Sequence, residues 1–225
     1  MKNTAPITEI FGSVQGEGIF LGCPQVFVRF YGCNLSCDYC DTKQKRSRKK
    51  NISVKELLKT IKSVSNGMKI VSLTGGEPLL HADFLLKCLP VLKRDGYNVY
   101  LETNGTLPGE LRRLIKQIDI VSMDIKLPSA CGRSLWALQS EFLGICKDKA
   151  FVKIVLTDQT DRGEFEQAVG IVKNHGVSIV LQPATTSGKI KPPKPSKLLS
   201  YLDYSLRFIA DVRVIPQTHR ILGLR

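Results

Sequence analysis

The sequence predicts an α/β protein built on a parallel sheet with helices outside it, in the form of a partial or full barrel. Short apolar strand segments alternate with helix segments along most of the chain. Repeated strand–helix units imply parallel strands joined by right-handed crossovers. Polar and cysteine motifs directly follow the strands, where such sheets place their chemistry. Strands are expected at residues 25–31, 70–73, 98–101, 118–123, 151–156, 177–181 and 212–215.

Helix signals fall between these strands. A helix begins at Ser53, because Glu56 three residues later completes a capping-box pattern. Prolines at 192, 193 and 195 mark a stiff loop rather than a domain boundary. We therefore expect one domain over residues 1–225, in which residues 1–24 precede the barrel. Further helices are expected at residues 82–93, 108–117, 135–146, 161–175 and about 197–209.

Composition predicts a cytoplasmic protein with no membrane partner. The hydrophobic fraction of 43% and the charged fraction of 24% are ordinary for a globular chain. No apolar run reaches the roughly 18 residues of a membrane span, and the first residues lack the apolar core of a secretory signal. The seven cysteines are an odd number, which argues against a fully paired disulfide framework.

The formal net charge of +13 admits several interpretations. Six of the charges lie in one run, KQKRSRKK, at residues 43–50. Such a run is most often a solvated loop, and an acidic small molecule is the next candidate for a partner. We expect no nucleic-acid partner, because no nucleic-acid-binding motif accompanies the charge.

Three cysteines follow the first barrel strand with the spacing C-x3-C-x2-C: Cys33, Cys37 and Cys40. Thiolates on one tight loop can ligate three irons of a 4Fe–4S cluster and leave the fourth iron open. A structural zinc site is the first alternative, but it needs a fourth ligand, usually from a second pair. The other cysteines and the histidines are scattered and offer no such pair. Core cysteines without chemistry are the remaining alternative.

Further motifs follow later strands and complete a known pattern. Residues 74–78 read Thr-Gly-Gly-Glu-Pro, residues 102–105 read Glu-Thr-Asn-Gly, and residues 124–126 read Asp-Ile-Lys. With the cysteine loop, they resemble the signature of radical S-adenosylmethionine (SAM) enzymes over essentially the whole chain. The resemblance implies the partial barrel of that superfamily and a cluster that cleaves SAM. It implies a SAM site made by Tyr39, Cys40, Asp41, Gly76, Asp124, Ile125 and Lys126.

The segment Glu9–Gly18, EIFGSVQGEG, narrows the resemblance. It is similar to the N-terminal segment of the 7-carboxy-7-deazaguanine synthase family. Asp41-Thr42 and the segments 181–185 and 217–219 are similar to other parts of that family's sequences. The resemblance implies that this protein converts 6-carboxy-5,6,7,8-tetrahydropterin to 7-carboxy-7-deazaguanine with loss of ammonia. This is a carbon–nitrogen lyase reaction in the biosynthesis of queuosine. Thr42 is implied to bind Mg²⁺ through oxygen. The implied substrate residues are Val14, Gln15, Gly16, Glu17, Arg29, Thr74 and His219.

The residue chemistry fits a pterin. Gln15 and Glu17 can pair with its guanine-like N–H edge, and the Arg29 guanidinium suits its carboxylate. Without the resemblance, the sequence is equally consistent with a second interpretation, in which Arg29, Thr42 and His219 are surface or loop residues with no role in binding. The family further implies an electron donor such as flavodoxin or ferredoxin, and a homodimer.

Two other functions stay open. Activases of glycyl-radical enzymes or of anaerobic ribonucleotide reductase share the cysteine spacing and the Gly-Gly-Glu motif, but they have no need of a pterin clamp such as residues 15–18 with Arg29. A basic metal-binding protein that binds nucleic acid without catalysis is the non-enzymatic alternative. Cleavage of SAM by the reconstituted protein separates the latter from the enzymes.

Overall fold

Nine strands form one mixed sheet in the computed structural model, which describes residues 3–40 and 48–224. Their order across the sheet is β3-β1-β2-β4-β5-β6-β7-β8-β9. The strands are β1 (Thr4–Val14), β2 (Pro24–Phe30), β3 (Lys50–Ser53), β4 (Ile70–Gly75), β5 (Asn98–Thr103), β6 (Ile120–Asp124), β7 (Ala150–Leu156), β8 (Ser178–Pro183) and β9 (Val212–Val214).

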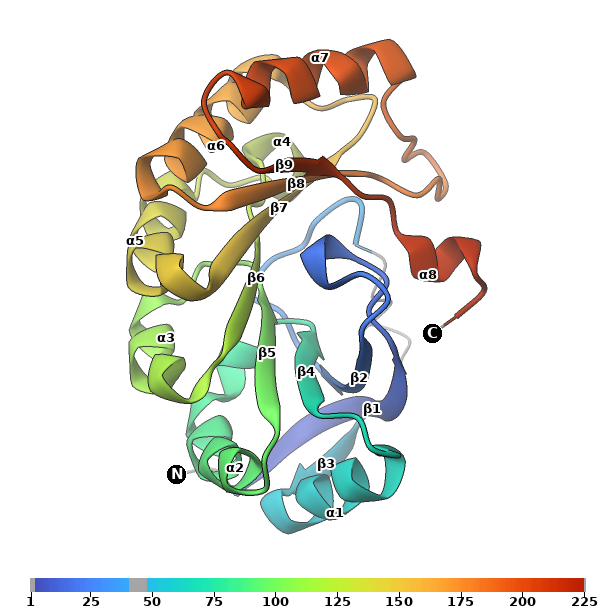
Figure 1. Ribbon diagram of the computed structural model, residues 1–225, viewed down its shortest axis with the longest axis vertical. Helices are drawn as coiled ribbons and strands as arrows, with labels where there is room; N and C mark the ends of the chain where they lie inside the picture. The colour runs from blue at the N-terminus through green and yellow to red at the C-terminus, as the bar shows by residue number, and fades with distance from the viewer. Residues whose placement is uncertain (1–2, 41–47, 225) are drawn as a thin grey trace.

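The seven strands predicted from the sequence are confirmed as one parallel set. β2, β4, β5, β6, β7, β8 and β9 pair in chain order, so each crossover sets the next strand beside the last. The sheet curves strongly but β3 and β9 remain its two edges, and the barrel is therefore partial (Figure 1). The carboxyl ends of all seven strands consequently meet at one rim.

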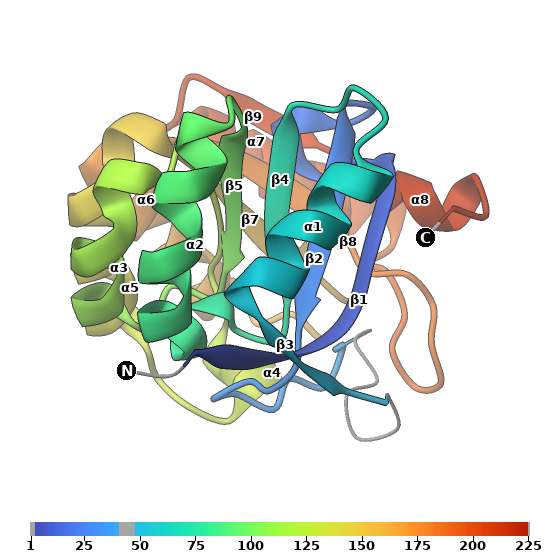
Figure 2. The same ribbon diagram turned by 90° about the horizontal axis from the view of Figure 1, so that it is seen from below.

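Helices cover the outer face of the curved sheet, as the alternating pattern predicts (Figures 1 and 2). Ser53 caps the first helix, and both hydrogen bonds of the predicted capping box with Glu56 are present. The helices are α1 (Val54–Val64), α2 (Ala82–Arg94), α3 (Pro108–Leu114), α4 (Pro128–Cys131), α5 (Trp136–Cys146), α6 (Arg162–His175), α7 (Pro195–Leu206) and α8 (Thr218–Ile221). Short 3-10 turns are η1 (Gly18–Phe20), η3 (Pro78–His81), η4 (Ile115–Gln117) and η5 (Lys147–Lys149).

The two faces of the sheet bury different side chains because neighbouring strand residues point to opposite sides. Outward residues such as Val99 and Leu101 join the main core beneath the helices. On the inner face, Tyr100, Phe151 and Val180 form a second, smaller apolar cluster. The turn η1 enters the barrel and packs on this cluster (Figure 1). Gly18 permits the entry, since its φ is +68° and a Cβ there would lie 2.7 Å from the Phe151 ring.

The structure also differs from the sequence predictions at four places, one of which is the unpredicted edge strand β3 at Lys50–Ser53. The N-terminal segment contains an 11-residue strand, β1, which pairs antiparallel with both β2 and β3. The last long helix starts at Pro195 and ends at Leu206, so this proline occupies the first helical turn rather than the preceding loop. The short helices α4 and α8 were not predicted. Within the described residues, the helices are all too short or too polar to cross a bilayer.

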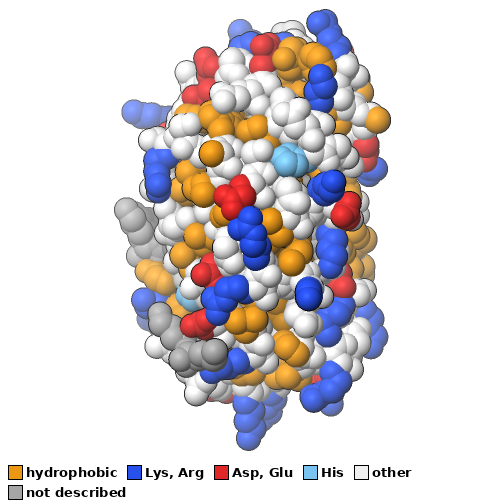
Figure 3. All heavy atoms as spheres, turned by 90° about the vertical axis from the view of Figure 1, so that its left-hand side faces the viewer, with side chains coloured by type: hydrophobic (Ala, Val, Ile, Leu, Met, Phe, Trp, Pro, Cys, Tyr) orange, Lys and Arg blue, Asp and Glu red, His pale blue; other side chains and the backbone are white. Residues whose placement is uncertain are grey.

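Basic side chains are dispersed over the outer helical face rather than gathered there. In Figure 3, which faces the left-hand side of Figure 1, Lys and Arg alternate with Asp, Glu and apolar groups. A continuous basic stripe is the usual footprint of a nucleic-acid site, and this face does not present one.

Candidate active site

The cysteine loop lies just beyond the carboxyl end of β2, at the predicted rim. The backbone N–H of Cys40 donates to the carbonyl of Cys37 at 3.1 Å, and that of Asp38 donates to Ala130 in α4 at 3.0 Å. Burial raises the pKa of the Cys37 thiol to about 11, Lys126 opposes the shift, and the neighbouring thiols add to it. Thiolate ligation of iron therefore has to release protons from this loop.

The three motif cysteines all lie on one loop of the described residues. No group of three His, Cys, Asp or Glu side chains within residues 3–40 and 48–224 is close enough to hold one metal ion. A 4Fe–4S cluster does not need such a group, because each of its thiolates binds a different iron. None of the three cysteines is in a disulfide. Asp41 and Thr42, which the resemblance assigns to SAM and Mg²⁺, lie outside the described residues.

The Gly-Gly-Glu turn after β4 is tied directly to the end of β2. The backbone N–H of Gly76 donates to Phe30 at 3.0 Å, and that of Glu77 donates to Gly32 at 2.8 Å. The buried Glu77 carboxylate accepts from the backbone N–H groups of Leu79 at 3.1 Å and Asn104 at 2.8 Å. Burial raises its pKa to about 7, although these hydrogen bonds oppose the shift. Glu77 therefore joins three consecutive strand ends.

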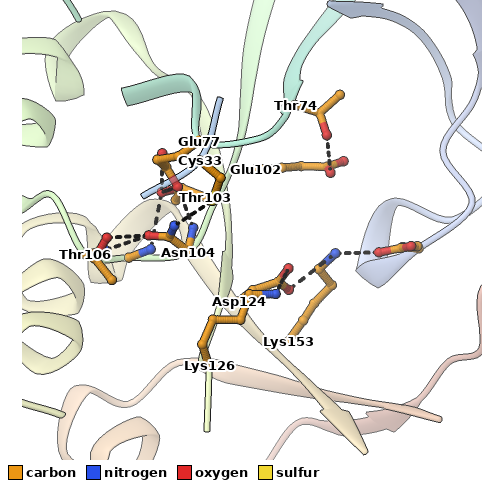
Figure 4. Close-up of polar contacts among 12 residues, drawn as sticks. Cys33, Thr74, Glu77, Glu102, Thr103, Asn104, Thr106, Asp124, Lys126 and Lys153 are labelled. Atoms are coloured by element: carbon orange, nitrogen blue, oxygen red, sulfur yellow. Dashed lines mark hydrogen bonds and ion pairs between the residues drawn. The ribbon is translucent and has the colours of Figure 1, made fainter. Parts of the chain in front are cut away.

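A chain of alternating charges crosses the inner face (Figure 4). Lys126 Nζ lies 3.0 Å from Asp124 Oδ2, and the same ammonium lies 5.3 Å from the Tyr39 ring centroid. Lys153 Nζ lies 3.4 Å from Asp124 Oδ1 and 2.5 Å from Glu17 Oε2. Burial alone would lower the pKa of Lys153, but the surrounding carboxylates raise it well above its ordinary value. The predicted SAM residues and the predicted substrate residues are thus connected by ion pairs.

Glu102 is a second carboxylate on the inner face. It accepts hydrogen bonds from Thr74 Oγ1 at 2.7 Å and Gln15 Nε2 at 2.9 Å, both of which were predicted to contact substrate. These partners are neutral, and no cation among the described residues is hydrogen-bonded to Glu102. Two buried amide atoms of strand residues, Gln25 Nε2 on β2 and Gln182 Oε1 on β8, have no hydrogen-bond partner among the described residues. Unsatisfied buried polar atoms are typical of a surface that a ligand or water completes.

The C-terminal helix α8 packs against the N-terminal segment. Gln217 Nε2 donates to Glu17 Oε1 at 2.8 Å, and the backbone N–H of Thr218 donates to Gly16 at 2.9 Å. The ring of His219 lies so close to Gly16 that a Cβ at this glycine would clash with it. The structure thus brings His219 to the predicted segment at Gln15–Glu17, about 200 residues away in the sequence. Val14 ends β1 immediately before this segment.

Arg29 lies on β2 beside Thr74 of β4, on the same inner face. Its Nε is 3.4 Å from Glu9 Oε2, and its guanidinium lies 5.6 Å from the Phe11 ring centroid. The side chain is 29% exposed. Arg29 is therefore a neighbour of the predicted substrate residues but is paired with Glu9.

Comparison with known proteins assigns this site to a family. Residues 27–130 match the Radical SAM superfamily. The 7-carboxy-7-deazaguanine synthase of Geobacter sulfurreducens is 40% identical over 247 residues, which cover 99% of this chain and 98% of that protein. The chain belongs to the 7-carboxy-7-deazaguanine synthase family. The Archaeoglobus fulgidus protein of the same name is 35% identical and covers 98% and 99% of the two chains. The crystal structure of QueE from Escherichia coli shares the fold, with a TM-score of 0.67 and 22% identity over 96% of this chain and 95% of that one.

Membership in the 7-carboxy-7-deazaguanine synthase family implies a 4Fe–4S cluster and SAM as cofactors, and the donor set fits them. The three thiols come from one loop at the strand ends, next to a Gly-Gly turn in which Gly75 packs directly against the Phe30 backbone. Full-length similarity to this family disfavours the activase alternative and the non-catalytic alternative alike.

Two residues of the charged interior escaped the sequence prediction. Lys153 received no role, although a single Lys inside the apolar strand FVKIVL signals a buried partner. Glu102 was recognised only as part of a motif that flanks SAM, and its contacts with Gln15 and Thr74 were not foreseen. Nothing in the local sequence shows that a strand residue faces the interior rather than the helices, since either face of a parallel sheet is buried.

Proposed function

We propose that this protein is a 7-carboxy-7-deazaguanine synthase that converts 6-carboxy-5,6,7,8-tetrahydropterin to 7-carboxy-7-deazaguanine with loss of ammonia. The product feeds the biosynthesis of queuosine and related deazapurines. The observation that carries the proposal is the pair of inward carboxylates, Glu17 and Glu102, which accept hydrogen bonds from the amides of Gln217 and Gln15 at the rim that holds the cysteine loop. These acceptors match the N–H donors on the aminopyrimidinone edge of a pterin.

The Gln15–Glu17 segment and Glu102 hold that edge in the proposed complex. Val14 and Gly16 offer backbone groups beside it, and Thr74 fixes one oxygen of Glu102 at 2.7 Å. Burial raises the pKa of Glu17, but the Lys153 ammonium and the Gln217 hydrogen bond together outweigh this effect and lower the pKa to about 2. Lys153 therefore helps to keep Glu17 ionised. An ionised Glu17 accepts N–H groups and cannot donate, which selects the donor edge of the ring.

Arg29 holds the substrate carboxylate in this proposal. Its partner Glu9 is 43% exposed, so exchanging that weak surface pair for a substrate anion costs little. The Phe11 ring, whose centroid lies 5.6 Å from the guanidinium, gives Arg29 a cation–π contact. His219, against Gly16, closes the same side and excludes water from the ring.

Cys33, Cys37 and Cys40 hold the cluster, which when bound supplies the electron that cleaves SAM to a 5′-deoxyadenosyl radical. Gly76 and the segment Asp124–Lys126 would bind SAM, and Tyr39, Cys40 and Asp41 would complete its binding site. The Lys126–Tyr39 contact supports the placement of Tyr39 beside that segment. Thr42 is the proposed Mg²⁺ ligand, because its hydroxyl would offer the oxygen donor that this hard cation prefers.

We also infer the setting in which the enzyme works. The whole chain acts as one domain in the cytoplasm, as a homodimer, and receives electrons from a flavodoxin or ferredoxin. Residues 48–50 are exposed and basic, and lie near the end of the cysteine loop in sequence. Their charge is complementary to the acidic surfaces of such donors.

Anaerobic incubation with SAM, a reductant and the carboxylated pterin tests the function, with product mass as the readout. We expect 7-carboxy-7-deazaguanine and ammonia in equal amounts. Cys33→Ala should abolish both cluster and product, whereas Cys23→Ala, a matched cysteine outside the motif, should keep both. SAM cleavage without any new purine-like product would refute the assignment.

A further inference from the structure

Three side chains form a closed ring of hydrogen bonds next to Cys33 (Figure 4). Asn34 Nδ2 donates to Thr106 Oγ1 at 2.8 Å, and Thr106 Oγ1 donates to Asn104 Oδ1 at 2.6 Å. Asn104 Nδ2 then donates to Asn34 Oδ1 at 2.9 Å. The ring joins the cysteine loop to the segment that follows β5.

The direction of every bond in this ring is fixed by one backbone group. The N–H of Thr106 can only donate, and it donates to Asn104 Oδ1 at 3.1 Å. The oxygen of the Asn104 amide therefore faces Thr106, and its NH₂ group faces the cysteine loop. One hydrogen of that NH₂ group serves Asn34, and the other is directed at Cys33 Sγ, 3.7 Å away.

Asn104 is also held rigidly. Its side chain is buried, and its backbone N–H donates to Glu77 Oε2 at 2.8 Å. Glu77 is itself fully buried and accepts from Thr103 Oγ1 at 2.9 Å. Cys33, in contrast, is exposed, and receives a second weak donor from the Leu35 backbone N–H at 3.5 Å. A fixed, buried donor thus meets an exposed ligand.

We propose that Asn104 is a positioning residue for the cluster: its amide donates to the Cys33 thiolate and raises the reduction potential of the cluster. Reduction adds negative charge to the cluster and its sulfurs. A hydrogen bond to a ligating sulfur stabilises that charge, so it favours the reduced form. The inference rests on the cluster ligation by Cys33 in the proposed function.

A redox titration of the reconstituted holoenzyme without SAM, followed by electron paramagnetic resonance, tests this role. In Asn104→Leu, which keeps the branching at Cγ and has no donor, the ratio of reduced to oxidised cluster at a fixed potential should fall about tenfold. For one electron this equals about 59 mV. Thr106→Val is the matched control, because it breaks the ring but keeps the backbone N–H that orients Asn104. In Thr106→Val the ratio of reduced to oxidised cluster should change less than about threefold. On a logarithmic scale this is roughly half of the change expected for Asn104→Leu.

The proposal is overturned if Asn104→Leu retains full iron content with an unchanged ratio, or if Thr106→Val shifts the ratio as much as Asn104→Leu does. Should Asn104→Leu lose the cluster, the isosteric Asn104→Asp decides the question. The carboxylate that this substitution introduces is acceptor-only when ionised, so a ratio at or above that of the wild type would refute the role of the donor. The titration uses no pterin, so its result does not depend on the proposed substrate. If the wild-type protein makes no deazaguanine, the proposed function fails, but the redox titration still tests the role of Asn104.

Discussion

Lys153→Met keeps the length of the side chain and removes the cation that Glu17 and Asp124 share. The side chain of Lys153 is 4% exposed, and those of Glu17 and Asp124 are 16% and 23% exposed, so water replaces little of the lost attraction. Removing one partner of a buried ion pair typically costs about 3–5 kcal/mol. We expect a loss of about 3 kcal/mol in the free energy of unfolding, at the low end because both carboxylates keep some contact with water.

The loss should depend on pH. Without Lys153 the pKa of Glu17 should rise above its native value of about 2, because the burial remains while the cation is gone. A raised pKa lets Glu17 take up a proton near pH 5 and so relieves the unpaired charge, whereas at pH 8 it stays ionised. Urea unfolding of the metal-free protein should therefore show the full loss at pH 8 and a loss smaller by about 1 kcal/mol at pH 5.

Lys116→Met provides the matched control, since Lys116 is exposed in η4 and such a change usually stays within about 0.5 kcal/mol. Affinity for the carboxylated pterin, measured on the holoenzyme, should fall only in Lys153→Met. An equal loss at both pH values would refute the protonation argument. A loss below about 1 kcal/mol at pH 8 would show that the two carboxylates do not depend on Lys153.

Three further changes test other parts of the site. Glu17 has a folded pKa of about 2 against 4.5, so it stabilises the fold above pH 4.5 and loses that effect as the pH falls toward 2. Glu17→Gln should flatten the acid side of the stability curve in urea unfolding by about 1–3 kcal/mol. Arg29→Ala should lower pterin turnover about a hundredfold with the iron content unchanged, and an unchanged ratio of product to 5′-deoxyadenosine would contradict a role in binding the carboxylate. Thr42→Ala should blunt the rise of turnover with Mg²⁺, and equal rates with Mg²⁺ and with chelator would exclude the metal.

The parallel strands were predictable because each carries a local signal. An apolar run such as that of β7 is long enough for a buried strand, and it ends at a polar turn. β1 lacks that signal. It alternates buried with half-exposed residues and contains a proline, and it becomes a strand only because β2 and β3 flank it. Its existence is a tertiary property, which local patterns do not encode.

The residues of the site likewise divide into those that carry a local sequence signal and those that do not. Cys33, Gly76 and Asn104 sit in short motifs whose spacing is itself the signal. The pairings of Glu17 with Lys153 and of Glu17 with Gln217 join residues 136 and 200 positions apart. Only the closure of the C-terminal helix α8 on the N-terminal segment brings the latter pair together. The sequence indicates that a charged residue is buried, but it does not indicate which residue neutralises that charge.

The end of β5 joins the two halves of the site through the two-residue period of a strand. Glu102 points inward to Gln15 and Thr74, while Thr103 donates to Glu77 on the other side. Asn104, just past the strand, reaches the cysteine loop. A slip of one residue in this strand would exchange these directions and disrupt the substrate face and the cluster loop together.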